Sequence, residues 1–343
     1  MDVATFCAES RVLVIAGKGG VGKTTVAATL ARMAADAGLS VLVVELEGKS
    51  GISAAFGSPD PLGYDEVTLY RRPASGRAPG SRAGSGRAPG DPGAAGLVRG
   101  RRITPDDALL EYLADHGLQR VSRRLVSSGV VDVVSTAVPG IRDVLVLGKV
   151  KQLERDQVAD LVVVDAPATG HAMTFLTSAS GLLDAARGGP VRAQAADVVD
   201  LLTDPARCRV MLVTLPEEMP VSETVEAAYL LEDRAGVQLG PVVVNSMDEI
   251  PPGLSSSVAD AAAAAGVDVP PALADVLEAA RRFRLHRAAL AAEQVARLAR
   301  ELPLPQLHLP RLHAAVLGPD EIGVLSRSMA SAVADLTAAQ AAR

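Results

Sequence analysis

Residues 17–25 constrain this chain more than any other part of its sequence. They fit the pattern G-x-x-x-x-G-K-[ST], follow an apolar run at residues 11–16 and precede a helical pattern at residues 23–37. A glycine-rich loop between a buried strand and a helix turns successive backbone N–H groups inward, and the helix adds its positive N-terminal end. The sequence therefore predicts a phosphate-binding loop formed by Gly17, Lys18, Gly19, Gly20, Val21, Gly22, Lys23, Thr24 and Thr25.

The loop pattern also predicts the role of single side chains. Lys23 is expected to reach the β- and γ-phosphates of a nucleotide, Thr24 to bind Mg²⁺ through its hydroxyl, and Thr25 to support the α-phosphate side. A second candidate site is the end of the apolar run at residues 161–165, where the last residue is a carboxylate, Asp165. Phosphate-loop enzymes hold Mg²⁺ through its water shell at such a position, so Asp165 is the second predicted metal residue.

Short valine-rich runs alternate with helical patterns along the chain, which is typical of a doubly wound, mostly parallel α/β sheet. One P-loop domain is therefore expected over residues 1–343. A helical subdomain is expected as an insertion at residues 103–155, where only helical patterns occur. The strands are predicted at residues 11–16, 41–45, 66–70, 160–165, 208–214, 241–245 and 306–309, and the helices at residues 23–37, 141–155, 172–187, 222–235, 272–302 and 321–342.

Charge and composition narrow the class of protein further. The net charge is −6, but residues 71–102 hold eight arginines against one acid, Asp91, among many Gly, Pro and Ala residues. Such a segment cannot form a core, so we predict a disordered insertion there, either inert or a tether for an anionic partner. The negative overall charge argues against a nucleic-acid partner. Two distant cysteines and the lack of a signal peptide or an apolar run long enough to span a membrane predict a reduced, cytoplasmic protein.

Two motifs carry a resemblance to a known family. Lys18 adds a second lysine to the loop, and residues 165–171 read Asp-Ala-Pro-Ala-Thr-Gly-His. The chain resembles the ArsA-like family of deviant-Walker-A ATPases, whose members drive arsenite pumps or deliver tail-anchored proteins, and is similar to actinobacterial ArsA-like ATPases. The resemblance implies ATP and Mg²⁺, a homodimer or a heterodimer with an ArsA-like paralogue, and a Lys18 that reaches the partner's phosphates. It also implies a switch loop that ends near His171. A solvated Lys18 and a His171 that only opens a helix are the plainer interpretations.

Other positions follow from the same resemblance. Glu47 stands where the family usually has the aspartate that orients the attacking water, and Glu45 is the fallback candidate. Asn245 resembles the family's adenine-binding asparagine, although a turn-forming asparagine would look the same. Pro310 stands where relatives pack a loop on the base.

Three functions remain open on this basis. The first is an ATP-hydrolysing switch in which a nucleotide-dependent dimer couples hydrolysis to the helical subdomain and to an unknown protein client or membrane partner. The second is a slow nucleotide-binding subunit of a heterodimer. The third is a ParA- or MinD-like positioning ATPase, which Lys18 fits but the T-G-H switch does not. Cys7 and Cys208 lie outside the helical region, and the chain has no C-x-x-C pair and only seven scattered methionines, which argues against arsenite and against a hydrophobic client.

Overall fold

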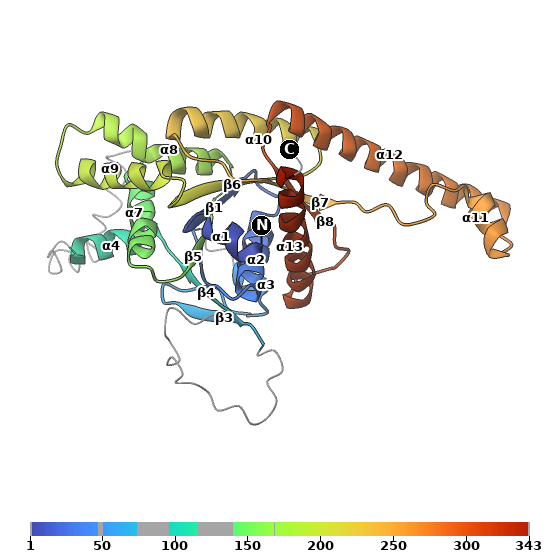
Figure 1. The fold of residues 1–343 in the computed structure, drawn as a ribbon, viewed down its shortest axis with the longest axis horizontal. Helices are drawn as coiled ribbons and strands as arrows, with labels where there is room; N and C mark the ends of the chain where they lie inside the picture. The colour runs from blue at the N-terminus through green and yellow to red at the C-terminus, as the bar shows by residue number, and fades with distance from the viewer. Residues whose placement is uncertain (1, 47–50, 74–95, 116–139, 168, 342–343) are drawn as a thin grey trace, which may run out of the picture.

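A central eight-stranded sheet organises the chain in the computed structural model (Figure 1). The structure describes residues 2–46, 51–73, 96–115, 140–167 and 169–341. Across the sheet the strand order is β3-β4-β2-β5-β1-β6-β7-β8. In chain order the strands are β1 (Val12–Gly17), β2 (Ser40–Glu45), β3 (Val67–Arg71), β4 (Leu97–Arg102), β5 (Leu161–Asp165), β6 (Cys208–Thr214), β7 (Val242–Met247) and β8 (Gln306–Pro310).

The strands other than β3 run parallel, as the continuous apolar runs predict. β1 lies at the centre, where Val12 pairs with Val162 of β5 on one side and with Cys208 of β6 on the other. All residues of β1, β2 and β5 are buried because helices cover both faces of the sheet. The predicted α/β class is thereby confirmed.

One prediction about the sheet edge is wrong. The expected disordered insertion at residues 71–102 contains β4, a strand that pairs in parallel with β2 and antiparallel with β3. Arg99 and Arg101 of β4 both form ion pairs with Glu66, and Arg101 also stacks 4.4 Å from the ring centre of Tyr64. These partners hold an arginine-rich strand that composition alone assigns to a loop. Residues 74–95 lie outside the described part of the chain.

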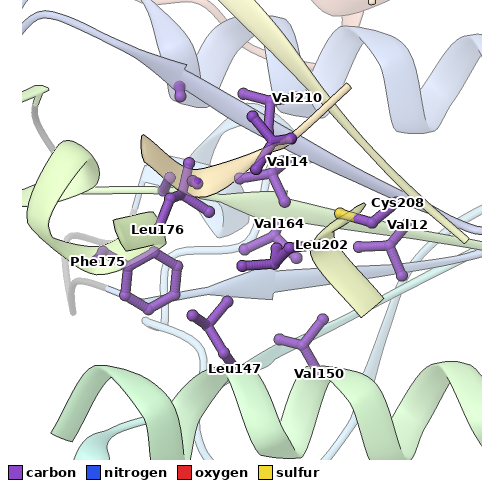
Figure 2. Packing of buried hydrophobic residues seen from close by; sticks show 14 of the residues in the cluster. Val12, Val14, Leu147, Val150, Val164, Phe175, Leu176, Leu202, Cys208 and Val210 are labelled. Atoms are coloured by element: carbon purple, nitrogen blue, oxygen red, sulfur yellow. The ribbon is translucent and has the colours of Figure 1, made fainter. Parts of the chain in front are cut away.

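Two helical layers enclose the sheet. On one face α2 (Lys23–Asp36) packs against α1 (Val3–Ala8), α3 (Gly51–Ala55) and α13 (Pro319–Ala341). The other face carries α7 (Ile141–Arg155), α8 (Thr169–Ala185), α9 (Pro190–Thr203), α10 (Glu218–Leu230) and the π-helical turn η1 (Leu231–Ala235). Figure 2 shows this second core, in which Val14 and Val164 of the sheet pack with Leu147 of α7 and Phe175 of α8.

Part of the predicted helical subdomain is described. α4 (Pro105–Asp115) packs against α7, and α7 coincides with the helix predicted at residues 141–155. Residues 116–139 of the predicted subdomain lie outside the described part of the chain. Two further helices, α11 (Val258–Ala265) and α12 (Pro271–Glu301), extend away from the body in Figure 1. None of the described helices has both the length and the apolar character that crossing a bilayer requires.

Candidate functional site

The predicted phosphate loop joins β1 to α2 at the centre of the sheet. Gly17, Gly20 and Gly22 have φ angles of 152°, 88° and 91°, a region that side chains other than glycine rarely adopt. A Cβ on Gly17 would lie 2.4 Å from the carbonyl oxygen of Val213, and one on Gly22 would lie 2.3 Å from the amide nitrogen of Asn245. A Cβ on Gly20 would meet nothing within 4 Å. A side chain at Gly17 or Gly22 would therefore clash with neighbouring atoms, whereas at Gly20 there is room for one and glycine is required by the positive φ angle.

The loop lysine lies over its own loop. Lys23 begins α2, is 9% exposed, and its Nζ donates a hydrogen bond to the carbonyl oxygen of Lys18 at 3.1 Å. The ammonium is thus held beside the loop instead of extending into solvent. This position suits a lysine that neutralises phosphates held by backbone N–H groups.

Thr24 and Asp165 meet at the predicted metal site. The Thr24 hydroxyl donates to Oδ2 of Asp165 at 2.7 Å, although the two residues are 141 positions apart. Asp165 ends β5 directly beside Ile15 of β1 and is 8% exposed. A hydroxyl and a carboxylate are the hard oxygen donors that Mg²⁺ prefers, and a shared water shell needs them this close. The donor set therefore fits the ion.

The ends of β2, β4 and β5 bring further charged residues to this edge. The register pairs Glu45 with Asp165 on one side and with Arg102 on the other. Glu45 is 3% exposed, so the fallback candidate for water positioning is a buried carboxylate next to Asp165, the predicted metal residue. Glu47 lies outside the described residues, and its role stays a prediction.

Lys18 has a partner that sequence reasoning missed. Its Nζ forms an ion pair with the carboxylate of Glu223 on α10, with the side chains 43% and 31% exposed. The available signal was weak: α10 follows β6, the strand beside β1, and carries several acidic residues. Within one chain Lys18 is therefore held by a carboxylate, and its contact across a dimer stays a prediction.

Asn245 supports the loop from β7. It is 8% exposed, and its side-chain nitrogen donates to the carbonyl oxygen of Val21 at 2.9 Å. A side-chain amide has a second N–H and a carbonyl oxygen, which are the groups that an adenine edge requires. Pro310 ends β8 beside Met247 of β7, so the structure brings both predicted base-binding residues to one edge. Their contact with a base stays a prediction.

The switch segment is described only in part. Asp165 is followed by Ala166, whose N–H donates to the carbonyl oxygen of Ile15 at 3.1 Å, and α8 begins at Thr169. Residue 168 and the side chain of His171 lie outside the described part, so the role of His171 stays a prediction.

The two cysteines lie in separate cores on opposite faces of the sheet, and burial raises the pKa of both Cys7 and Cys208 to about 12.

The fold and this loop define a P-loop nucleotide-binding protein. A family model described as the CobQ/CobB/MinD/ParA nucleotide binding domain matches residues 12–64. The chain is 38% identical over 244 residues to the ATPase BagA of Mycobacterium tuberculosis, a match that covers 68% of this chain and 64% of that protein. It is 26% identical to an arsenical pump-driving ATPase of Escherichia coli and 27% identical to one of Acidiphilium multivorum, with 69% of this chain and 35% of each relative covered.

These matches confirm the predicted resemblance to the ArsA-like group of P-loop ATPases. The chain's match spans slightly less than two thirds of the length of the mycobacterial relative.

Proposed function

We propose that this protein is a Mg²⁺-dependent ATPase that works as a molecular switch, with ATP closing a dimer and hydrolysis reopening it. The observation that carries this proposal is the hydrogen bond between Thr24 and Asp165 next to a strand–loop–helix unit with two lysines. Those residues supply each part that nucleotide binding with a metal requires: a loop of backbone donors, a cation and two hard oxygens.

Each residue at the site has a separate task. Backbone N–H groups of the loop and the Lys23 ammonium hold the phosphates, while Thr24 and Asp165 orient the metal shell. When bound, Mg²⁺ offsets the negative charge that develops on the transferred phosphoryl group. Asn245 keeps one N–H on the loop carbonyl of Val21 and offers its remaining amide groups to the base.

Hydrolysis requires a carboxylate that orients water. Glu47 is the proposed residue, with Glu45 as the fallback because it is buried beside Asp165 in the register of β2 and β5. The extra methylene of Glu47 relative to aspartate changes the geometry and lowers the expected rate. Lys18 is proposed to leave Glu223 and reach the phosphates bound by the partner, as an arginine finger does.

The client side of the switch is proposed to be the helical subdomain at residues 103–155. α7 contacts α8, which begins four residues after Asp165, so a change at the metal site has a short path to the subdomain. The segment within residues 71–102 that lies between β3 and β4 is proposed to be an insertion that hydrolysis does not need.

The test measures ATP binding, Mg²⁺-dependent hydrolysis and molar mass in solution for the natural protein and three variants. Lys23→Ala is expected to lose ATP binding. Lys18→Ala and Glu47→Gln are expected to bind ATP but to lose turnover at least tenfold. A natural protein that binds ATP without any change of mass, and a Lys18→Ala variant that hydrolyses normally, would refute the switch.

Two alternatives give different results in the same experiment. A nucleotide-binding subunit of a heterodimer would bind ATP tightly with no turnover until a paralogue is added, which the glutamate at position 47 favours. A positioning ATPase would bind DNA or lipid vesicles only with ATP, an outcome that the matched CobQ/CobB/MinD/ParA domain makes worth measuring.

A further inference from the structure

The outer part of α12 carries an apolar face that no described part of the chain covers. α12 has 31 residues, a length of about 46 Å, and Leu298 is its one fully buried member. Figure 1 shows the helix leaving the body and carrying α11 near its far end. Five large apolar side chains of this outer part are 43–65% exposed: Leu273, Val276, Leu277, Phe283 and Leu290. A set of this size on one helix marks an interaction surface.

Four of these exposed residues form a narrow stripe, and Leu277 lies beside it. Val276, Phe283 and Leu290 are seven residues apart, and Leu273 and Ala280 precede two of them by three residues. This is the spacing of a seam between two helices. We call the stripe the arm seam; its members are Leu273, Val276, Ala280, Phe283, Arg287 and Leu290. Arg284 and His286 flank it, so the stripe is too narrow for a helix that lies on a lipid surface.

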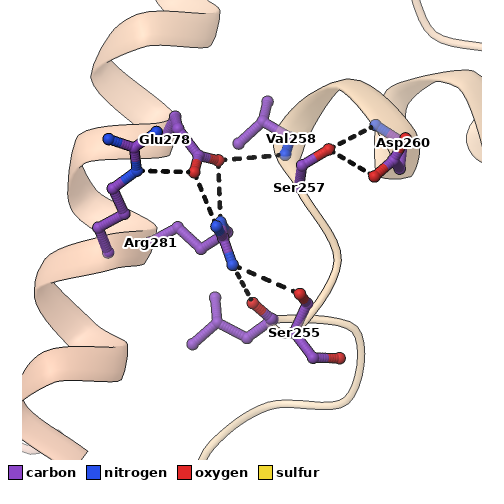
Figure 3. A network of polar contacts seen from close by, with 8 residues as sticks. Ser255, Ser257, Val258, Asp260, Glu278 and Arg281 are labelled. Atoms are coloured by element: carbon purple, nitrogen blue, oxygen red, sulfur yellow. Dashed lines mark hydrogen bonds and ion pairs between the residues drawn. The ribbon is translucent and has the colours of Figure 1, made fainter.

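The opposite face of α12 already has a partner (Figure 3). Glu278 accepts hydrogen bonds from the guanidinium of Arg281 at 2.7 and 2.8 Å and from the N–H of Val258 at 3.3 Å. Arg281 also donates to the carbonyl oxygen of Leu254 at 3.1 Å, which clasps the loop before α11. Since these contacts lie across the helix from the arm seam, α11 does not cover the seam.

The base of the arm leads to the nucleotide site. The last turns of α12 pack on α10, where Arg297 donates to the hydroxyl of Ser222 at 3.2 Å. The next residue of α10, Glu223, holds Lys18. A cavity of about 440 Å³ between α12 and the start of α10 is lined by Phe283 and Leu290 on the arm and by Glu217 and Glu218 on the body. The inner end of the seam therefore lies next to α10, the helix that holds Lys18.

We infer that the arm seam binds the arm seam of a second copy of this chain in antiparallel orientation, an inference that rests on the dimer of the proposed function. Antiparallel pairing sets Phe283 against Ala280 of the second copy, Leu273 against its Leu290 and Val276 against its Arg287. The ring of Phe283 then meets a small residue, the two leucines meet each other, and each contact occurs twice, as a two-fold interface requires. Arg287 leans toward Glu217 of its own chain at 3.9 Å, which takes its charge away from the seam.

The exposed area supports a second copy as the occupant. The exposed parts of the four large apolar side chains in the arm seam, Leu273, Val276, Phe283 and Leu290, amount to about 400 Å² per copy, about half of the ~800 Å² that each partner contributes to a standard interface. The nucleotide face supplies the rest.

Engineered cysteines test the arrangement, because both natural cysteines are buried. We would mix the single variants Ala280→Cys and Phe283→Cys, oxidise with ATP and Mg²⁺ present, and measure disulfide-linked dimer. The expected yield is at least tenfold above that of a control mixture of Phe283→Cys with Ala289→Cys, whose new thiol lies on the other side of the helix. A yield no higher than the control overturns the inference.

A charge variant separates this inference from the proposed function. Phe283→Asp is expected to raise the dimer dissociation constant at least tenfold, while its affinity for a fluorescent ATP analogue stays within twofold of the natural value. A variant that dimerises normally with ATP overturns the arm seam and leaves the proposed switch intact. A dimer that cross-links through the seam but ignores ATP supports the seam and overturns the nucleotide switch.

Discussion

The contact between Gly22 and Asn245 makes a quantitative prediction about the phosphate loop. In Gly22→Ala the new Cβ would lie 2.3 Å from Nδ2 of Asn245, which must move and so lose its hydrogen bond to the carbonyl oxygen of Val21. That buried bond is worth about 1–2 kcal/mol. The φ of 91° adds roughly 1–2 kcal/mol of strain to any residue with a side chain. We therefore expect Gly22→Ala to lower the free energy of unfolding by about 2–4 kcal/mol.

A double-mutant cycle isolates the contact. Asn245→Ala alone loses the bond to Val21 and costs about 1–2 kcal/mol, and the double variant loses that bond only once. The double variant is thus expected to be more stable than the sum of the single effects by about 1–2 kcal/mol.

Gly20→Ala is the matched control for backbone strain. Its φ is 88°, close to that of Gly22, but its Cβ would meet nothing within 4 Å. It should therefore show the strain alone and add independently to Asn245→Ala. The assay is urea unfolding without nucleotide. Single effects of Gly22→Ala and Asn245→Ala that add to within about 0.5 kcal/mol would refute the reasoning.

Three further predictions follow from named contacts. Glu223→Gln frees Lys18 from a partly exposed ion pair worth about 0–1 kcal/mol, so the ATP concentration at half-maximal dimerisation should fall up to about fivefold. An equal change in the control variant Glu226→Gln would contradict this. Arg207→Ala removes one of the two ion-pair partners of Glu154 among the described residues; the carboxylate is 4% exposed and keeps Arg11 at 3.6 Å. Calorimetry should show that the free energy of unfolding falls by about 2–3 kcal/mol. The control variant Arg155→Ala, at an exposed position, should lower it by less than about 0.5 kcal/mol. The Arg281 guanidinium lowers the pKa of Glu278 from 4.5 to about 2. The contact that holds α11 on α12 should therefore be complete above pH 4.5 and weaken as the pH falls toward 2, which hydrogen exchange of α11 would report. Full exchange of α11 already at pH 5 would argue against this contact.

Local patterns were enough to predict seven of the eight strands and the phosphate loop. The strand predicted at residues 208–214 and the helix predicted at residues 141–155 match β6 and α7, because continuous apolar runs and helical periodicity are properties of neighbouring residues. The phosphate loop was equally visible, since its glycines and Lys23 must be consecutive to form one turn. β4 was missed because half of its six residues are arginines, whose partners Glu66 and Tyr64 are more than 30 positions away.

The order of residues along the chain is thus enough to predict the class of fold, the phosphate loop and the residue types available for a metal and a base. Which of these residues meet depends on the three-dimensional arrangement of the chain. Thr24 and Asp165 are 141 positions apart, Lys18 and Glu223 are 205 apart, and Val21 and Asn245 are 224 apart. Such contacts depend on the order of strands across the sheet and on the packing of helices over it. No local pattern encodes that order, because it results from how the whole chain buries its apolar surface.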